Sequence, residues 1–240
     1  MNNQPVYKRI LLKLSGEALA PATRDDGILD FDFIHKVADV LRSCKDAGVE
    51  IGVIVGAGNI WRGLSGSVKM ERARADHMGM LATCINSIAL QDVFMAHGMD
   101  TVVMSAVEMD TFADHYNTRN ANKLLAEGKI VIFAGGTGSP YFSTDTAAAL
   151  RAAEIHADAL LMAKNVDYLY DSDPKKNPDA KPIYDVTYAE ILARGLKAFD
   201  LSAVTFCKEN GITAYGFALA DPQNIYRAVM GEQVGTAMHN

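Results

Sequence analysis

The chain of 240 residues has only three cysteines, no long uninterrupted apolar run and no excess of basic residues. Cys44, Cys84 and Cys207 are far apart and form no C-x-x-C or Cys/His spacing, so we expect buried, reduced thiols and no disulfide, metal site or nucleophile. No apolar run reaches the roughly 18 residues that cross a bilayer, and the first five residues do not resemble a signal peptide. We therefore expect a cytoplasmic protein that does not bind a membrane.

The charge balance is acidic, with 23 Lys and Arg against 29 Asp and Glu and a formal net charge of -6. A general nucleic-acid-binding protein needs a basic face to neutralise phosphates, so this balance argues against nucleic acid as a partner. Any phosphate must be bound by a local arrangement of groups. The apolar share of 49% is enough for a full core, and without a linker-like stretch we expect one domain over residues 1–240.

A repeated pattern predicts alternating helices and strands. Helical segments end at Gly48, Gly98, Gly128 and Gly211, and a short apolar run follows each of them. A glycine past a helix end supplies the left-handed cap, and strands that are apolar throughout are typical of sheets buried on both faces. We expect strands over 7–14, 50–55, 101–104, 129–133, 160–163 and 213–217. The predicted fold class is α/β, a three-layer sandwich with a mainly parallel central sheet flanked by helices.

Glycine-rich or cationic residues follow four of these strands. They are Lys13-Leu14-Ser15-Gly16, Gly56-Ala57-Gly58-Asn59 with Arg62, the stretch from Gly135 to Asp145, and Lys164-Asn165. Ligands of doubly wound sheets gather at the carboxyl ends of the strands, and consecutive backbone N–H groups before a helix bind phosphate without net charge. A tight turn alone would explain each glycine run, but the four together predict a nucleotide or phosphate site.

Two common nucleotide-binding fingerprints fail. A dinucleotide motif beginning at Gly56 needs a glycine where Trp61 stands. The Walker spacing from Gly58 to Gly63 is followed by Leu64-Ser65 instead of Lys-Ser or Lys-Thr. The sequence therefore argues against a nicotinamide-dependent redox enzyme and against a P-loop kinase.

Four motifs match one known family in order and in spacing. They are Lys13-Leu14-Ser15-Gly16-Glu17-Ala18-Leu19, Gly58-Asn59 with Arg62-Gly63, Asp76-His77-Met78-Gly79-Met80-Leu81, and Thr137-Gly138-Ser139-Pro140-Tyr141-Phe142-Ser143-Thr144-Asp145. Together they resemble the bacterial uridylate (UMP) kinases of the amino-acid-kinase superfamily, over about residues 7–235.

The resemblance implies the amino-acid-kinase fold, with UMP-binding and ATP-binding halves of one sheet. It implies transfer of the ATP γ-phosphate to UMP, giving UDP and ADP, in pyrimidine nucleotide (CTP) biosynthesis. Mg²⁺ would be carried with the nucleotide, so no resident metal site is expected. It also implies an allosteric homohexamer that UTP inhibits.

Catalysis is expected to rest on Lys13, Arg62 and Asp145. Because the acceptor is already an anionic phosphate, no general base is required, and catalysis consists of positioning and charge neutralisation. Lys13 would contact the transferring phosphoryl group, Arg62 would clamp phosphate bidentately, and Asp145 would orient the lysine and the metal-bound phosphates. The alternatives are a surface lysine, a solvated loop arginine and a carboxylate that favours a first helical turn.

The expected nucleotide contacts follow the same motifs. Those for UMP are Gly56, Ala57, Asp76, Thr137, Gly138, Ser139, Pro140, Tyr141, Phe142, Ser143 and Thr144. Those for ATP are Lys13, Leu14, Ser15, Gly16, Gly58, Arg62, Lys164, Asn165, Tyr170 and Asp173. Asp76 would accept hydrogen bonds from the ribose hydroxyls, and Ser143 or Thr144 would read the pyrimidine edge. The alternative for these three residues is a helix N-cap, which for Ser143 or Thr144 can coexist with ligand contact. Lys164 is either a second phosphate cation or a surface lysine.

The chain departs from the family pattern in two places. Ala57 replaces the middle glycine of a Gly-Gly-Gly-Asn run, which is tolerable where φ is negative. Residues 21–26 differ from the glycine-containing stretch associated with GTP activation, which speaks against activation by GTP.

Two rival functions remain open. One is a superfamily kinase acting on a carboxylate or carbamate such as acetylglutamate, against which the segment 137–144 argues. The other is a nucleotide-binding regulator that has lost transfer, against which Lys13, Arg62 and Asp145 argue.

Overall fold

The computed structural model describes residues 4–61, 70–174, 176–197 and 199–240. Its central sheet has nine strands in the order β4-β3-β5-β2-β1-β6-β10-β11-β9. Their bounds are β1 Arg9–Leu14, β2 Glu50–Val55, β3 Thr101–Ser105, β4 Asp114–His115, β5 Ile130–Ala134, β6 Ala159–Lys164, β9 Asp185–Thr187, β10 Ala214–Ala218 and β11 Thr236–His239. Neighbours are parallel from β4 to β10, and β11 runs antiparallel to β10. The mainly parallel sheet is confirmed.

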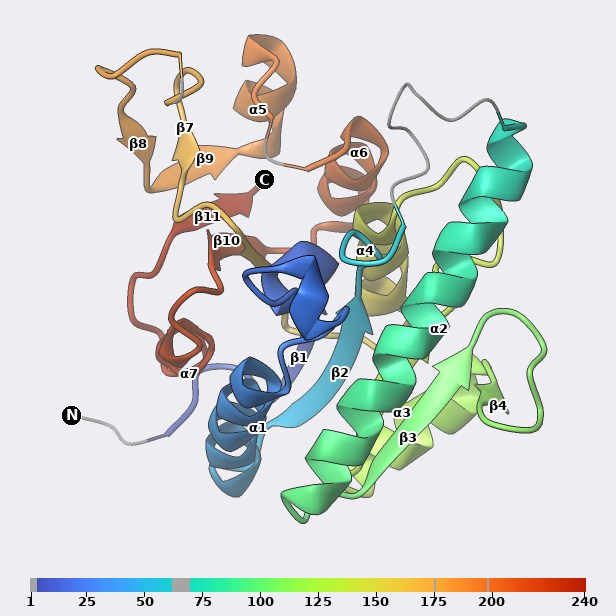
Figure 1. Cartoon of the computed structure of the whole chain (residues 1–240). Coiled ribbons are helices and arrows are strands. Elements are labelled where there is room, and N and C mark those ends of the chain that lie inside the picture. Colours follow the sequence, from blue (N-terminus) through green and yellow to red (C-terminus); the bar gives the residue numbers. More distant parts are fainter. Residues whose placement is uncertain (1–3, 62–69, 175, 198) are drawn as a thin grey trace.

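Helices cover both faces of the sheet, which confirms the three layers (Figure 1). One face is covered by α1 (Phe31–Asp46), α2 (Arg72–Ala96) and α7 (Gln223–Val229). The other is covered by α3 (Thr118–Ala126), α4 (Thr144–Glu154), α5 (Tyr188–Arg194) and α6 (Leu201–Asn210). Beside these lie two 3-10 turns, η1 (Gly16–Leu19) and η2 (Arg24–Asp26), and a separate antiparallel pair, β7 (Leu169–Tyr170) with β8 (Pro182–Ile183).

The period of two in β1 decides where its last side chains point. Ile10, Leu12 and Leu14 are buried in the cluster beneath α1 and α2, whereas Leu11 is buried in the cluster beneath α4. Lys13 has the same parity as Leu11, so its side chain lies on the α4 face, where it is 7% exposed. A lysine at the end of a fully buried strand is thereby placed under the N-terminus of a helix.

The glycines at the helix ends adopt the left-handed conformation that the sequence predicts. Gly48, Gly98, Gly128 and Gly211 all have positive φ, with values of 92°, 71°, 79° and 64°. These values are in the left-handed region that glycine reaches without steric cost, so each helix can end and turn back toward the sheet. Among the described residues, the non-glycine residues with positive φ are Tyr141 and His156, so the condition placed on Ala57 is met.

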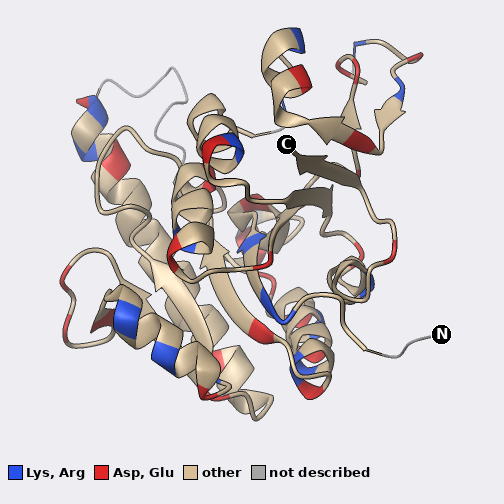
Figure 2. Ribbon diagram, turned by 180° about the vertical axis from the view of Figure 1, so that it is seen from behind, with Lys and Arg blue, Asp and Glu red and all other residues tan. Residues whose placement is uncertain are grey.

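The three cysteines are buried and unpaired, as expected. Burial raises the pKa of Cys44 and of Cys207 to about 12, so neither thiol is a useful nucleophile at neutral pH. On the side of the molecule seen from behind, acidic and basic residues are interspersed along the helices (Figure 2).

Helix α2 is long and apolar enough to cross a membrane by length and composition alone. Half of its most apolar window is buried inside the protein, and the helix packs on β2, β3 and β5. These contacts are those of a helix that covers a sheet, and they leave its outer side exposed.

Candidate functional site

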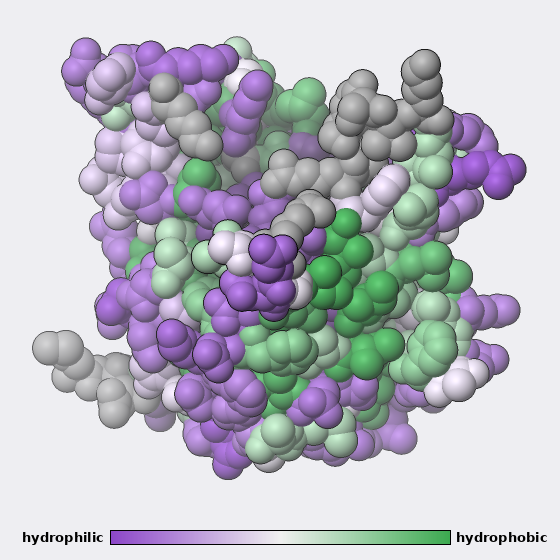
Figure 3. Space-filling model, viewed as in Figure 1, coloured by the Kyte–Doolittle hydropathy of each residue, from purple (hydrophilic) through white to green (hydrophobic). Residues whose placement is uncertain are grey.

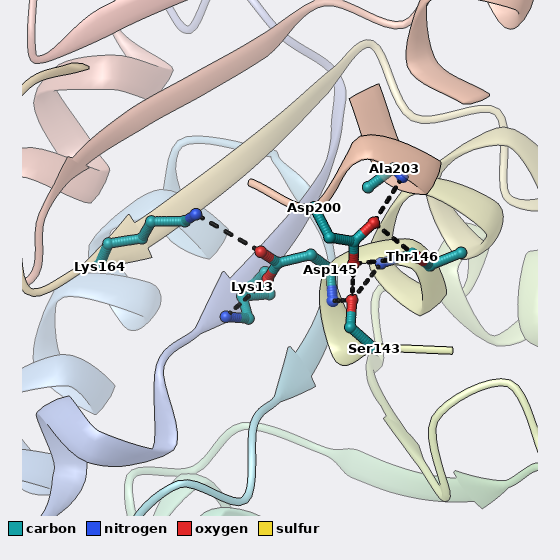
Figure 4. A network of polar contacts seen from close by, with 7 residues as sticks. All are labelled: Lys13, Ser143, Asp145, Thr146, Lys164, Asp200 and Ala203. Carbon is teal, nitrogen blue, oxygen red and sulfur yellow. Dashed lines mark hydrogen bonds and ion pairs between the residues drawn. The ribbon is translucent and has the colours of Figure 1, made fainter. Parts of the chain in front are cut away.

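Three charged side chains meet where β1 and β6 end and α4 begins (Figure 4). Lys13 Nζ lies 2.9 Å from Asp145 Oδ1, and Lys164 Nζ lies 3.4 Å from Asp145 Oδ2. Because β1 and β6 are neighbouring parallel strands, the residues at their carboxyl ends emerge at the same edge of the sheet. The structure thus brings together Lys13, Asp145 and Lys164, which are far apart in the sequence.

The electrostatics of this cluster favour an anionic ligand. Burial alone would raise the pKa of Asp145, but the ammonium groups of Lys13 and Lys164 outweigh burial and hold that pKa below its usual range. Burial, with the nearby charge of Lys13, lowers the pKa of Lys164 although Asp145 opposes the shift. Two ammonium groups share the carboxylate of Asp145, and the charge of Asp200 also acts on Lys164, so the cluster offers a phosphate two closely held ammonium groups.

Ser143 prepares the N-terminus of α4. Its hydroxyl oxygen accepts hydrogen bonds from the backbone N–H groups of Asp145 (3.0 Å) and Thr146 (3.1 Å) and donates its proton to Asp200. The Asp200 carboxylate also accepts from Thr146 Oγ1 (3.0 Å) and from the backbone of Ala203 (2.8 Å), where it caps α6. Ser143 therefore caps α4 with its hydroxyl proton already donated, and the neighbouring Thr144 is a second hydroxyl at this helix start.

A cavity of about 700 Å³ lies beside this cluster. The loop after β2, the first turns of α2, the segment before α4 and the start of α6 all contribute to it. Of the predicted UMP contacts, the lining contains Ala57, Asp76, Thr137, Tyr141, Phe142, Ser143 and Thr144. Gly56, Gly138, Ser139 and Pro140 belong to the same two loops. Gly58, predicted for ATP, also lines this cavity, together with Trp61, Met80 and Thr83.

The glycine loops after β1 and β2 are packed directly against each other. A Cβ on Gly16 would lie 2.7 Å from Asn59 Oδ1 and 2.8 Å from the carbonyl carbon of Gly56, closer than real side chains come. The ladder continues past the strands, since the backbone N–H of Gly56 donates to Leu14 O at 3.0 Å. Glycine at position 16 is therefore required for close approach of two backbones, which is how phosphate-binding loops are assembled.

Polar residues of α2 hold these loops in place, and sequence analysis did not identify them. Asn86 is fully buried and donates to Gly56 O (2.8 Å) and Asn59 Oδ1 (2.8 Å). Thr83 Oγ1, also buried, accepts from the backbone N–H of Gly135 (2.9 Å). The available signal was an asparagine and a threonine on the apolar side of a helix, because buried polar groups need partners. Arg72 and Asp200 are further cavity-lining residues that were missed.

Asp76 is not a helix cap. The N-cap of α2 is Glu71, and Asp76 lies in the second turn, where its carboxylate reaches the cavity and accepts from the backbone N–H of Tyr141 at 2.8 Å. This carboxylate joins α2 to the segment 137–144.

The residues predicted for ATP are more scattered. Asn165 Nδ2 lies 3.5 Å from Glu17 Oε2, so it joins the ends of β6 and β1, whereas the side chain of Leu14 is buried in the core. Tyr170 lies in β7 and Asp173 in the turn that follows it. Neighbouring residues of that segment, together with the end of β10 and α7, line a second cavity of about 400 Å³. Arg62 lies outside the described residues.

Comparison with known proteins agrees with this arrangement. Residues 8–215 match the model of the amino acid kinase family. The structure is similar to that of UMP kinase from Bacillus anthracis, with a TM-score of 0.92, 34% identity, and coverage of 97% of this chain and 96% of that one. It is also similar to that of UMP kinase from Ureaplasma parvum, with a TM-score of 0.90, 34% identity and complete coverage of both chains.

A more distant match is uridylate kinase from Archaeoglobus fulgidus, with a TM-score of 0.74, 26% identity, and coverage of 95% of this chain and 99% of that one. The family match spans the glycine loops, the lysine–aspartate cluster and the cavity described above. The chain therefore belongs to the amino acid kinase family.

Proposed function

We propose that this protein is a UMP kinase, which transfers the γ-phosphate of ATP to UMP. The observation that carries the proposal is the cluster of Lys13, Asp145 and Lys164 beside the 700 Å³ cavity lined by Thr137, Tyr141 and Thr144. Two UMP kinases share 34% identity with the chain over nearly its whole length, which supports the same assignment.

UMP would occupy this cavity, with its ribose at Asp76 and its phosphate directed toward Ala57, Thr144 and the lysines. A Cβ at position 56 would point toward Thr144, 3.5 Å from its Oγ1. Because residue 56 is glycine, this corner of the cavity has no side chain from that position. A backbone amide, a threonine hydroxyl and a cationic cluster are the groups that bind phosphate oxygens. UTP, as an inhibitor, carries the same base and ribose and would compete for this half of the site.

ATP would bind on the opposite half of the same domain, beyond the ends of β6 and β10. The 400 Å³ cavity lined by Asp167, Tyr168 and Arg227 lies on that side, and its lining residue Ala218 is the strand-register partner of Lys164, which contacts Asp145. Among the described residues no group of three or more His, Cys, Asp or Glu could hold a metal ion, and Asp145 is engaged by two lysines. Mg²⁺ would arrive with the phosphates of ATP, where it neutralises their charge.

In the transfer step, an oxygen of the UMP phosphate attacks the γ-phosphorus of ATP. The bond from that phosphorus to the β–γ bridging oxygen breaks, and the electron pair leaves with ADP, so UDP forms without a general base. Lys13 and Lys164 would neutralise the charge that builds on the transferring group, and Asp145 would hold both ammonium groups in position.

An exposed apolar stripe on the outer side of α2 supports assembly into a homohexamer. Its residues are Met78, Leu81, Ile85, Ile88 and Met95, which are between 38% and 57% exposed. The stripe forms the continuous hydrophobic area over α2 in Figure 3. A large exposed apolar patch is typical of a protein–protein contact, and a second copy of this helix would cover it. We also propose that the protein acts in the cytoplasm, in pyrimidine nucleotide (CTP) biosynthesis.

A substrate panel tests the function directly. ADP release is measured with UMP, CMP, dUMP and acetylglutamate as acceptors, with GTP and UTP added in separate reactions. We expect turnover with UMP and none with acetylglutamate, inhibition by UTP and no activation by GTP. Turnover with acetylglutamate would favour a carboxylate kinase, and no turnover with any acceptor would favour a nucleotide-binding regulator.

A further inference from the structure

The carboxylate of Asp76 is fixed by two donors that reach the same oxygen. Arg72 Nε donates to Oδ2 at 2.8 Å, and the backbone N–H of Tyr141 donates to Oδ2 at 2.8 Å. Within the described part of the chain, both donors reach Oδ2 and neither takes the second oxygen, Oδ1, and Arg72, Asp76 and Tyr141 all line the same cavity. The side chain of Asp76 is 17% exposed, so the position of its charge is set by these donors more than by bulk water.

Helix stability does not explain an arginine at position 72. Arg72 is the first residue of α2, where the positive end of the helix dipole disfavours a cation. An arginine four residues before its acidic partner is also the less favourable order for a pair on a helix surface. We therefore expect the Arg72–Asp76 pair to serve ligand binding in the cavity and not the stability of α2.

Tyr141 has an unusual backbone conformation at its contact with Asp76. Its φ is 72°, a left-handed conformation that is unusual for a bulky residue, and the residue is 66% exposed. The Asp76 carboxylate holds its backbone N–H, and the guanidinium carbon of Arg72 lies 5.2 Å from the centre of its ring. Such conformations persist where surrounding contacts determine them, and they cluster at ligand sites.

We propose that Arg72 is a positioning residue for the ribose of the acceptor nucleotide. By occupying Oδ2, it and the backbone of Tyr141 turn Oδ1 of Asp76 toward the ribose hydroxyls and fasten the segment 137–144 to α2. Arg72 thereby increases selectivity for a ribonucleotide over a deoxyribonucleotide. This inference rests on the proposed function, in which Asp76 binds the ribose.

The test compares steady-state kinetics with UMP and dUMP for the full chain and three variants. In Arg72→Gln we expect the KM for UMP to rise about tenfold, with kcat within about twofold of the parent, because one oriented bond to a charged group is lost. The ratio of kcat/KM for UMP to that for dUMP falls, since the deoxynucleotide lacks one of the hydroxyls that the carboxylate recognises. Arg72→Lys keeps the charge without the fixed Nε and gives an intermediate ratio.

Arg74→Gln is the matched control. Arg74 lies in the same turn of α2, is paired with Glu71 at 3.1 Å, and its side chain is 78% exposed. We expect this variant to keep the KM and the selectivity of the parent. Thermal melting of each variant reports folding, and if Arg72→Gln does not fold, Arg72→Lys carries the comparison.

Outcomes separate this inference from the proposed function. If the unmodified protein does not phosphorylate UMP, the proposed function fails. If it does, but the Arg72 variants keep the parental KM and UMP/dUMP ratio, the inference is wrong. An equal loss with UMP and dUMP would also overturn it, because a role in holding the loop alone weakens both nucleotides alike.

Discussion

Replacing Lys13 with methionine removes one cation from the proposed reacting centre while filling nearly the same space. Lys13 is 7% exposed and its ammonium lies 2.9 Å from Asp145, so its charge acts in a region largely shielded from water. At an effective dielectric of about 20, one unit charge at about 4 Å contributes roughly 4 kcal/mol, which corresponds to about a thousandfold in rate. We expect kcat to fall by at least about a hundredfold, since the rest of the cluster remains.

Lys13→Met should fold. Asp145 keeps its contact with Lys164 at 3.4 Å, so no buried carboxylate is left without a cation. The substitution also removes the repulsion of Lys13 on Lys164, one of the causes that lower the pKa of Lys164. We therefore expect a melting temperature within a few degrees of the parent and a raised pKa of Lys164.

The assay is coupled ADP release with saturating UMP and ATP, alongside thermal melting. Lys8→Met is the control, because Lys8 is an exposed lysine that precedes the other end of β1. A kcat of Lys13→Met within threefold of the parent, in a folded protein, would refute the role of Lys13. A large loss in Lys8→Met would show that the assay reports folding and not chemistry.

Three further predictions follow from the site. Asp76→Asn raises the KM for UMP by about tenfold or more with a smaller change in kcat, because a hydrogen-bonded charge facing the ribose is lost. Steady-state kinetics with varied UMP measure the KM, and an unchanged KM would contradict the prediction. Because burial holds the pKa of Lys164 below the ordinary 10.5, kcat/KM falls as pH rises through that lowered pKa, and Lys164→Met does not show this fall. Between the lowered pKa and 10.5 the unfolded chain binds more protons than the folded protein, so the contribution of Lys164 to folding stability rises with pH. A pH–rate profile checks the first sign, and melting curves at several pH values check the second. Gly16→Ala lowers the melting temperature and the affinity for ATP, since the added Cβ would overlap the backbone of Gly56. Gly136→Ala is the control, because its Cβ would meet no neighbour while its φ of 61° is strained for alanine. Equal losses of stability in the two variants would show that the overlap at Gly16 has no effect.

The sequence alone determined the framework of this protein, because the framework depends on local patterns. Runs that are mostly apolar and do not alternate predicted the buried parallel strands, and the start of β1 at Arg9 instead of Tyr7 is the kind of end error such patterns allow. Helix α5 begins at a capping box formed by Thr187 and Glu190, which is a local sequence pattern of the same kind. Glycines past the helix ends were found because their positive φ is a property of the residue itself.

The resemblance carried by short motifs also came from the sequence, and it identified Lys13 and Asp145 before any contact was known. The contact between Lys13 and Asp145 follows from the position of Lys13 in the strand, since alternation along β1 places Lys13 on the α4 face. The structure does not describe Arg62, so its role stays a prediction.

Only the tertiary structure decided how residues distant in sequence share one site. Lys164 joined Asp145 because β6 is the neighbour of β1, and strand order is a long-range property that no local pattern encodes. The same holds for Asn86 beneath the β2 loop and for Asp200 on Ser143, whose partners lie 30 and 57 positions away. Likewise, the position of Asp200 in the fold decides where Ser143 donates its single hydroxyl proton.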